Sequence, residues 1–218
     1  MANYANTDIT KAGLITAAGE LFAEHGIDAV SVRDIARKAG ANIGLIHYHF
    51  GGKDGLIEAV MAFAGELWEN DPFGTYLAEH RHLLTTAEGK NTVIAEMIEM
   101  FFDLLYSPLK PVWCCKLLFQ ILQRDLAISE KVFVGIGAPL FDAFMQLYRL
   151  VSGDEDTENA YLWSSTIISP AVVHAINPLP IGRSSPEDAF FDCFLNKLRA
   201  FCCRQACHSI SLLAIAKK

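Results

Sequence analysis

The sequence has no long uncharged apolar run and only a modest number of charges. The first shortage argues against a membrane-spanning protein, and the second argues against a disordered one. Its most apolar stretch, residues 132–151, is interrupted by Asp142, Gln146 and Arg149, whereas a membrane-spanning helix needs about 20 predominantly apolar residues. Charged residues make up 20% of the 218 residues and hydrophobic residues 52%, a balance unlike that of disordered chains. We therefore expect a globular protein without a membrane span.

The first ten residues lack the basic start and apolar core of a secretion signal, and the six cysteines include no CxxC spacing. We expect reduced thiols in a reducing cytosol, where disulfides are rare, and no metal or other cofactor. Buried small hydrophobes are the default interpretation of the cysteines, and a metal or redox sensor is the alternative. That alternative rests on two clusters, Cys114 with Cys115, and Cys202, Cys203 and Cys207 with His208.

Strand-like alternation is absent as well, and apolar residues recur instead at intervals of three and four. Residues 8–25 show this spacing and are followed by Gly26, which is typical of a helix end. The pattern predicts an all-α fold of about ten helices. The helices predicted beyond residue 72 lie near residues 75–87, 91–106, 111–124, 129–151, 157–176 and 186–208.

A segment near the N-terminus contains the start and stop signals of two short helices. Ser31 stands three residues before Asp34, the spacing of a capping box that begins a helix. Gly40 suits the left-handed residue that ends this helix, and Asn42 suits the cap of a second helix over residues 43–50. Two short helices joined by a tight turn form a helix-turn-helix, whose second helix lies in the major groove of DNA. The segment therefore predicts binding to duplex DNA.

The charge distribution agrees with this prediction. Residues 31–53 contain four basic side chains and one acidic side chain, whereas residues 56–218 contain 13 basic and 19 acidic ones. A longer helix is expected from Lys53 to Trp68, with Asp71 and Pro72 closing it. A small positive island thus precedes an acidic body in a chain whose net charge is −7.

The string LFAEHGIDAVSVRDIARKAGANIGLIHYHFGGKDGL resembles the N-terminal domain of TetR-family transcriptional regulators. The likeness runs from about Leu14 to Leu56, and ANIGLIHYHFGGK is most similar to the subgroup with a YHFG-type recognition helix. Two positions depart from the family: residue 43 is isoleucine where lysine is common, and residue 47 is histidine where tyrosine is common. Ile43 is able to touch a thymine methyl group but cannot donate a hydrogen bond to guanine.

The resemblance implies contacts with DNA at both ends of the motif. Phosphates would be met at the start of the first short helix and by Lys53, and the start of the second helix would face the groove. His47 and Tyr48 have packing within the core as an alternative. The predicted DNA-binding residues are Ser31, Arg33, Asn42, Ile43, Gly44, Leu45, His47, Tyr48, His49 and Lys53.

The resemblance also implies two domains: an N-terminal three-helix helix-turn-helix domain over residues 1–52, and a larger C-terminal helical domain over residues 53–218 for ligand binding and dimerisation. The helix over residues 53–70 would connect the two. The expected protein is a cytoplasmic, nucleoid-associated repressor that binds a palindromic operator as a homodimer and is released by a small molecule. The candidate ligand-binding residues, each with ordinary core packing as its alternative, are Trp68, Phe102, Tyr106, Trp113, Cys114, Phe119, Phe144 and Trp163.

The C-terminal half leaves further alternatives open. The segments 129–151 and 157–176 are apolar around more than half of each helix, and we predict that they pair with their copies in a dimer. Pro170 should kink its helix, either shaping a pocket or curving the helix around a neighbour. One rival function is an enzyme using His174 or the cysteines, although the order of residues matches no catalytic pattern. The other is an interaction or small-molecule-binding protein that keeps the fold without binding an operator.

Overall fold

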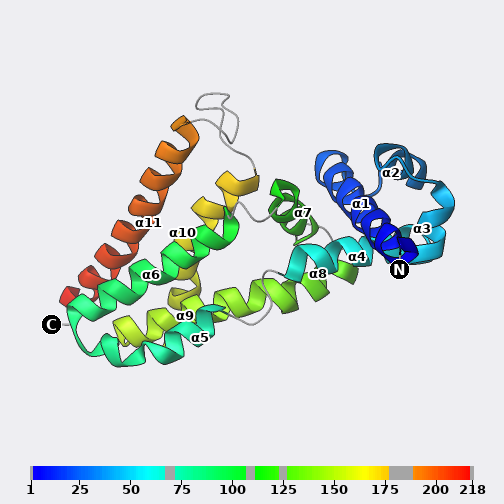
Figure 1. Cartoon of the computed structure of the whole chain (residues 1–218). Helices are drawn as coiled ribbons and strands as arrows, with labels where there is room; N and C mark the ends of the chain where they lie inside the picture. The colour runs from blue at the N-terminus through cyan, green and yellow to red at the C-terminus, as the bar shows by residue number, and fades with distance from the viewer. Residues whose placement is uncertain (1, 67–71, 107–110, 123–126, 177–188, 217–218) are drawn as a thin grey trace. The chain divides into compact units, whose positions relative to one another are not determined.

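The computed structural model describes residues 2–66, 72–106, 111–122, 127–176 and 189–216 (Figure 1). Within these ranges it contains eleven α-helices and no strand, which confirms the predicted all-α class. None of the described helices combines the length and apolarity that a membrane crossing requires. The α-helices are α1 (Ala2–His25), α2 (Val32–Lys38), α3 (Ile43–Phe50), α4 (Lys53–Gly65), α5 (Pro72–Glu79), α6 (Ala87–Leu105), α7 (Val112–Leu122), α8 (Ala127–Val132), α9 (Ala138–Ser152), α10 (Thr157–Ile176) and α11 (Ala189–Ala216).

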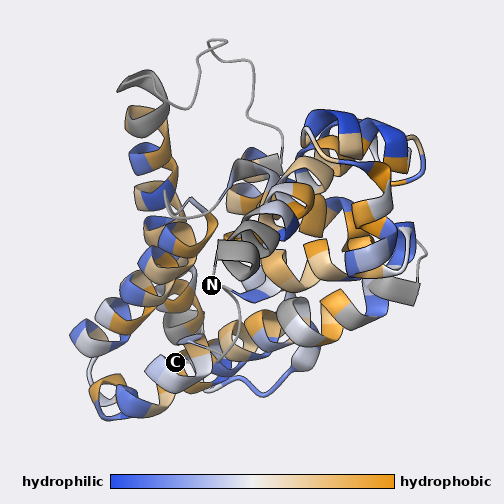
Figure 2. Cartoon of the chain, turned by 45° about the vertical axis from the view of Figure 1, so that its right-hand side comes forward, coloured by the Kyte–Doolittle hydropathy of each residue, from blue (hydrophilic) through white to orange (hydrophobic). Residues whose placement is uncertain are grey.

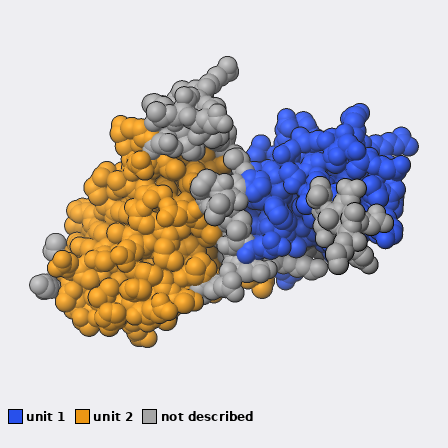
Figure 3. Space-filling view, viewed as in Figure 1, with its two compact units in different colours: residues 1–67, 110–133 blue, residues 68–109, 134–218 orange. Residues whose placement is uncertain are grey.

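The chain divides into two compact units, which Figure 3 colours separately. Unit 1 comprises residues 1–67 and 110–133, and unit 2 comprises residues 68–109 and 134–218. Unit 1 therefore holds α1 to α4 together with α7 and α8, although α7 lies far from the others in the sequence. The domain boundary predicted after residue 52 stays a prediction about the DNA-binding module.

Unit 1 is built on the buried side of α1. Leu14, Ala18 and Phe22 are each fully buried, at the spacing of four that puts them on one helix face. Gly26, with φ of 84°, takes the left-handed conformation just after the helix end, as the sequence predicts. The helix begins at Ala2 rather than near residue 8, because its first turns extend beyond the apolar face on which the prediction rested.

Unit 2 has an aromatic core between α5, α6 and α9. The ring of Phe73 lies 5.9 Å from that of Phe144, and the ring of Phe101 lies 6.0 Å from it. All three side chains are almost completely buried. Figure 2 shows polar and apolar residues along the long helices of this unit, as amphipathic helices require when one side packs and the other meets water.

Three helices predicted beyond residue 72 differ from the structure. The segment 129–151 is not one helix, because the π-helical turn Phe133–Gly137 separates α8 from α9. Gly135 and Gly137 favour helix formation weakly, and Pro139 has no N–H to continue the ladder. The segment 75–87 holds the end of α5 and a 3-10 turn, Arg81–Thr85.

The last of the three, predicted over residues 186–208, spans Ala189–Ala216 in the structure. Helix α6 also begins earlier than predicted, because the hydroxyl of Thr86 accepts a hydrogen bond from the Gly89 N–H at 3.0 Å and caps the helix. Pro72 begins α5 rather than only closing the helix before it, a position that proline tolerates well.

Candidate nucleic-acid interface

Helix α2 starts with the predicted capping box. The Asp34 N–H donates to the Ser31 hydroxyl oxygen at 3.2 Å, and the Ser31 N–H donates to an Asp34 carboxylate oxygen at 3.3 Å. The Ser31 hydroxyl in turn donates to the carboxylate at 2.6 Å. Hydrogen bonds from the Ser31 side chain and backbone lower the pKa of Asp34 below its usual value. The start of the helix-turn-helix is therefore fixed by two neighbouring side chains.

The turn between α2 and α3 also follows the predicted plan. Gly40 has φ of 61°, the left-handed conformation in which glycine pays no steric penalty. The Asn42 side-chain oxygen then accepts a hydrogen bond from the Gly44 N–H at 2.8 Å, and Asn42 thereby caps α3. The Leu45 N–H donates at 2.9 Å to the Asn42 carbonyl, so two N–H groups of the first turn of α3 are bonded to this one residue.

Helix α3 turns one face inward and presents the other to solvent. Ile46 is fully buried, whereas Tyr48 is 80% exposed and Ile43 is 38% exposed. Gly44 and His47 are also exposed. Packing of His47 or Tyr48 within the core, the alternative interpretation of these residues, is therefore wrong. Leu45, His49 and Phe50 are half-buried and lie at the edge between the two faces.

Lys53 has a structural role that its sequence position did not reveal. Its ammonium donates a hydrogen bond at 2.7 Å to the carbonyl of Ile27, in the loop between α1 and α2. It is the first residue of α4, where the partial positive charge of the helix end also favours an anion. An ammonium group has three donors, so the bond to Ile27 leaves capacity for a phosphate.

Two of the basic side chains on α2 form ion pairs within the protein, and the third is exposed to solvent. Arg37 pairs with Asp34 of its own helix, and Lys38 pairs with Glu20 of α1 at 2.9 Å. The Lys38 pair, which joins two helices, was not predicted, because the register between α1 and α2 is set by tertiary packing. Arg33 is exposed at the second position of α2.

The candidate ligand residues are divided between the two units. Trp113, Cys114 and Phe119 lie on α7 in unit 1, whereas the unit 2 candidates are Phe102 on α6, Tyr106 just after α6, Phe144 on α9 and Trp163 on α10. Trp68 lies outside the described residues. The candidates in unit 2 are mostly core side chains, of which Phe102 and Phe144 are fully buried.

Tyr106 belongs to a buried polar contact in unit 2. Its hydroxyl donates to the carbonyl of Ala171 at 2.9 Å and lies 3.0 Å from Nδ1 of His174. His174 is only 6% exposed and stacks on Phe194 with a ring separation of 4.9 Å. Burial lowers the pKa of His174, so that the neutral imidazole is favoured. The contact explains Tyr106 as a residue that holds α10 to the end of α6.

The six cysteines lie in varied surroundings. Cys114, Cys115 and Cys202 are buried, and Cys193 is exposed. Burial raises the pKa of Cys202 and of Cys203 to about 11, which disfavours the thiolate. Among the described residues, no three His, Cys, Asp or Glu side chains are grouped closely enough to hold a metal ion.

Comparison with known proteins places the helix-turn-helix in a family. Residues 14–60 match the profile of "Bacterial regulatory proteins, tetR family". The HTH-type transcriptional repressor Rv3405c of Mycobacterium tuberculosis is 48% identical over 54 residues, which are 25% of this chain and 29% of that protein. The "Probable HTH-type transcriptional regulator YttP" of Bacillus subtilis is 42% identical over 153 residues, or 70% of this chain and 68% of that protein. The chain thus spans less than a third of the mycobacterial relatives and about two thirds of the Bacillus one.

Solved structures share the fold over nearly the whole chain. A TetR-family transcriptional regulator from Streptomyces coelicolor has a TM-score of 0.52 at 16% identity, with 94% of each chain covered. A transcriptional regulator from Aquifex aeolicus also has a TM-score of 0.52, at 19% identity, with 94% of this chain and 99% of that chain covered. At these identities the likeness concerns the fold alone, which extends through both units.

Proposed function

Because the chain belongs to the tetR family of bacterial regulatory proteins, we propose that it is a ligand-responsive transcriptional regulator that binds a palindromic DNA operator as a homodimer. The observation that carries the proposal is the exposed face of α3. Tyr48, His47 and Ile43 project from a short helix whose start is capped and whose opposite face is anchored by Ile46. A rigid helix with an exposed mixed face is what insertion into the major groove requires.

The charge of the N-terminal module argues for two copies acting together. Residues 1–55 contain five basic and six acidic side chains, so one copy neutralises few phosphates. Two copies on the half-sites of a palindrome double the phosphate and base contacts, while a preformed dimer loses translational and rotational freedom only once. In this proposal Arg33, Ser31 and Lys53 contact phosphates, and Asn42, Leu45 and His49 lie beside the groove-facing residues of α3.

The homodimer is assigned here to helices of unit 2. Helix α9 buries Leu140, Phe144 and Leu147 within its own unit, and so it contributes less apolar surface than the sequence pattern predicted. Helix α10 leaves Leu162 61% exposed and Val173 55% exposed. A twofold interface centred on α10 would cover this surface. Sedimentation should give a dimer at micromolar concentration, and a monomer there would contradict the assignment.

The remaining parts of the proposal follow from the family. The effector is a small molecule bound in the C-terminal helical domain over residues 53–218, the regulator acts as a repressor in the bacterial cytosol, and its α3 is of the YHFG type. The ligand shifts operator affinity only through a difference in its affinity for the DNA-bound and free conformations. We propose no catalytic activity, since the relatives that it matches are named as transcriptional regulators.

The test is a selection of bound duplexes from a random library, followed by salt titration of the winning sequence. A palindrome should be enriched, and its affinity should fall steeply as salt rises. If no palindrome is enriched, the DNA-binding function is wrong and the rival of an interaction protein with this fold is favoured.

Two arginine variants assign the contacts. Arg33→Ala should weaken binding to all duplexes and reduce the salt slope by about one, the effect of losing one phosphate contact. Arg204→Ala, at an exposed site on α11, is the matched control and should leave both quantities unchanged. Equal effects of the two substitutions would contradict the assignment of α2 to the interface.

A further inference from the structure

A tryptophan of α7 lies directly against the backbone of α1. A Cβ atom added at Gly19 would lie 2.4 to 2.6 Å from three ring atoms of Trp113, closer than real carbon atoms approach. Gly13, six residues earlier on the same helix, has open space at the corresponding position. Glycine inside a helix costs about 1 kcal/mol relative to alanine. The close approach of the indole ring accounts for a glycine at position 19.

The same indole ring also contacts α4. Phe63 stacks on Trp113 with a ring separation of 5.8 Å and an interplanar angle of 24°. Trp113 is only 7% exposed, and its Nε1–H has no hydrogen-bond partner among the described residues. A buried donor without a partner is destabilising, and a phenyl ring would fill similar space without it. The contact of α7 with α1 and α4 at this point is therefore made by the ring itself and not by a hydrogen bond from the indole N–H.

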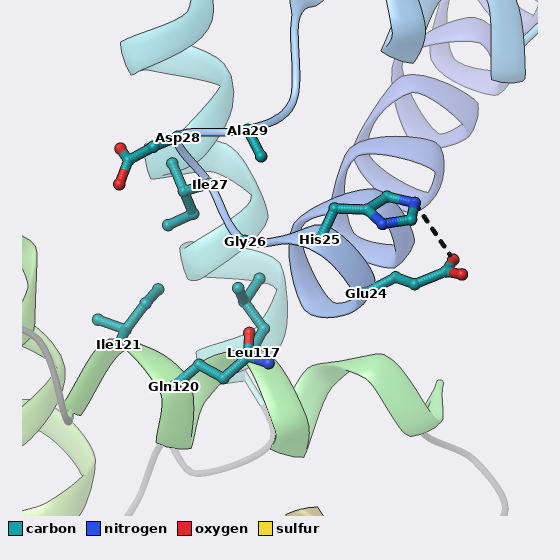
Figure 4. Close-up of a pocket in the computed structure, with 9 residues that line it drawn as sticks. All are labelled: Glu24, His25, Gly26, Ile27, Asp28, Ala29, Leu117, Gln120 and Ile121. Carbon is teal, nitrogen blue, oxygen red and sulfur yellow. Dashed lines mark ion pairs between the residues drawn. The ribbon is translucent and has the colours of Figure 1, made fainter.

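A second contact joins α7 to α1 one turn further along α1. The Gln120 side-chain N–H donates to the carbonyl of Ala23 at 3.1 Å. Beyond it, Figure 4 shows Leu117, Gln120 and Ile121 on α7 facing the loop that carries Gly26 and Ile27, and these residues line a groove. Helix α7 is thus seated along α1 from Gly19 to the start of this loop.

The segment that contains α7 is connected in sequence to unit 2 at both of its ends. The segment 110–133 belongs to unit 1, but the sequence on both sides of it belongs to unit 2. Helix α1 packs on α2, and α4 packs on α3, so the two helices that hold the DNA-facing motif are the two that the indole contacts. A shift of α7 is therefore transmitted to both supports of the motif.

We infer that Trp113 is a positioning residue, seated on Gly19 and Phe63, through which α7 sets the arrangement of the DNA-reading helices. The inference rests on the proposed function, since its main readout is operator binding. In this inference Trp113 couples the position of α7 to that of the DNA-reading helices, and it replaces the ligand contact expected for Trp113 from the sequence.

The first test compares Gly19→Ala with Gly13→Ala in the full-length protein. Operator affinity and the preferred spacing between half-sites are measured at a temperature where circular dichroism shows both variants folded. Gly19→Ala should weaken operator binding by about tenfold and change the preferred spacing, because the added methyl group displaces the indole. Gly13→Ala should match the wild type. Identical affinity and spacing in the two variants would overturn the inference.

The second test uses changes at Trp113 itself. Trp113→Phe keeps a ring between Gly19 and Phe63 and removes the unpartnered donor, so it should keep operator affinity within about twofold of the wild type. Trp113→Leu in the Gly19→Ala background should restore the wild-type spacing, because the shorter side chain makes room for the methyl group. A loss of affinity without any change of spacing, unrelieved in the double variant, would show a purely structural role and contradict the inference.

Hydrogen exchange keeps the result distinct from that of the proposed function. Gly19→Ala should speed amide exchange in residues 32–50 by about tenfold relative to Gly13→Ala, with no DNA present. If the wild type selects no duplex but this difference is seen, the DNA-binding function fails and the coupling stands. If the exchange rates of the two variants agree, the coupling is wrong even where operator binding is found. The exchange measurement also decides the matter if Gly19→Ala is too unstable for binding assays, since Trp113→Leu alone should then show the faster exchange.

Discussion

The helix-turn-helix of residues 31–50 and unit 2 are held together by contacts of different range in the sequence. In the helix-turn-helix, the main caps join Ser31 to Asp34 and Asn42 to Gly44, over three and two positions. In unit 2, Tyr106 and His174 are 68 positions apart, and the Trp163 indole donates to Ser209 across 46 positions. Local contacts are legible in a sequence, whereas distant ones depend on how helices pack. This difference explains why the function of the helix-turn-helix can be predicted from the sequence and that of unit 2 cannot.

The exposed surfaces of the two units also differ in the kinds of side chain that they present to solvent. Unit 1 exposes a tyrosine and a histidine on α3, groups that can donate and accept hydrogen bonds at a nucleic acid. Unit 2 exposes Leu162 and Val173 on α10 and Phe201 and Leu212 on α11, side chains whose exposure to water is unfavourable. One surface therefore suits DNA and the other suits a protein partner.

The largest effects should come from removing a core phenyl ring from each unit. Phe22 and Phe144 are both fully buried, and Phe→Ala at either site should cost about 3–5 kcal/mol. If the units are separate cores, Phe22→Ala should raise hydrogen exchange mainly in residues 2–66 and 111–122. Phe144→Ala should raise it mainly in residues 138–176. Equal loss of protection throughout the chain in both variants would instead show that the two cores unfold as one.

Two arginines test the value of distant pairing. Arg199 of α11 donates to Glu99 and, at 2.8 Å, to Asp103 of α6, and it lies over the Phe102 ring. Arg37 is 80% exposed and pairs with Asp34 of its own helix.

Arg199→Ala should therefore cost about 1.5–3 kcal/mol, the range for hydrogen bonds to charged groups. Arg37→Ala should cost about 0.5 kcal/mol or less. Urea denaturation of the two variants measures both losses, and comparable values would remove this distinction between the helix-turn-helix and unit 2.

The sequence predicted the helix-turn-helix closely because each of its signals acts over a few residues. Helix α3 begins and ends where predicted, and Ser31, Gly40 and Asn42 have the predicted conformations. The roles of these residues toward DNA remain predictions, since DNA contacts are not visible in a single chain. Lys53 shows the limit even here, because its bond to Ile27 depends on how α4 packs.

The seat of α7 on α1 could not be predicted, because 94 positions separate Gly19 from Trp113. The one available signal was a glycine on the apolar face of a helix, which indicates a close approach but not its partner. The division of the candidate ligand residues between two units could not be predicted for a related reason. Large apolar side chains predict burial, yet the unit in which each is buried depends on the tertiary arrangement.

Two left-handed glycines give a smaller and closely matched comparison. Gly40 in unit 1 has φ of 61° and Gly153 in unit 2 has φ of 64°, and an added Cβ would meet no atom within 4 Å at either site. Alanine should therefore cost about 1 kcal/mol at each position, through backbone strain alone. Thermal melts should show similar losses, but only Gly40→Ala should weaken operator binding. Weaker binding in Gly153→Ala as well would show that the turn after α9 also matters for the DNA-bound form.

The smallest effect concerns pH and the buried imidazole of His174. Burial lowers the pKa of this side chain in the folded protein below its ordinary value of 6.5. The unfolded chain then takes up a proton first, so the contribution of His174 to stability is complete above pH 6.5 and is lost as pH falls through the lowered pKa. His174→Phe keeps the aromatic contact with Phe194 and removes the titration.

The free energy of unfolding of His174→Phe should accordingly depend less on pH between 7 and 5 than that of the wild type. His208→Phe changes an exposed histidine of the neighbouring helix and should keep the wild-type slope. A slope in His174→Phe equal to that of the wild type would mean that the imidazole is solvated in the folded state. The contact between Tyr106 and His174 would then be too open to hold α10 against the end of α6, and the distant pairing that distinguishes unit 2 would rest on Arg199 and Trp163 instead.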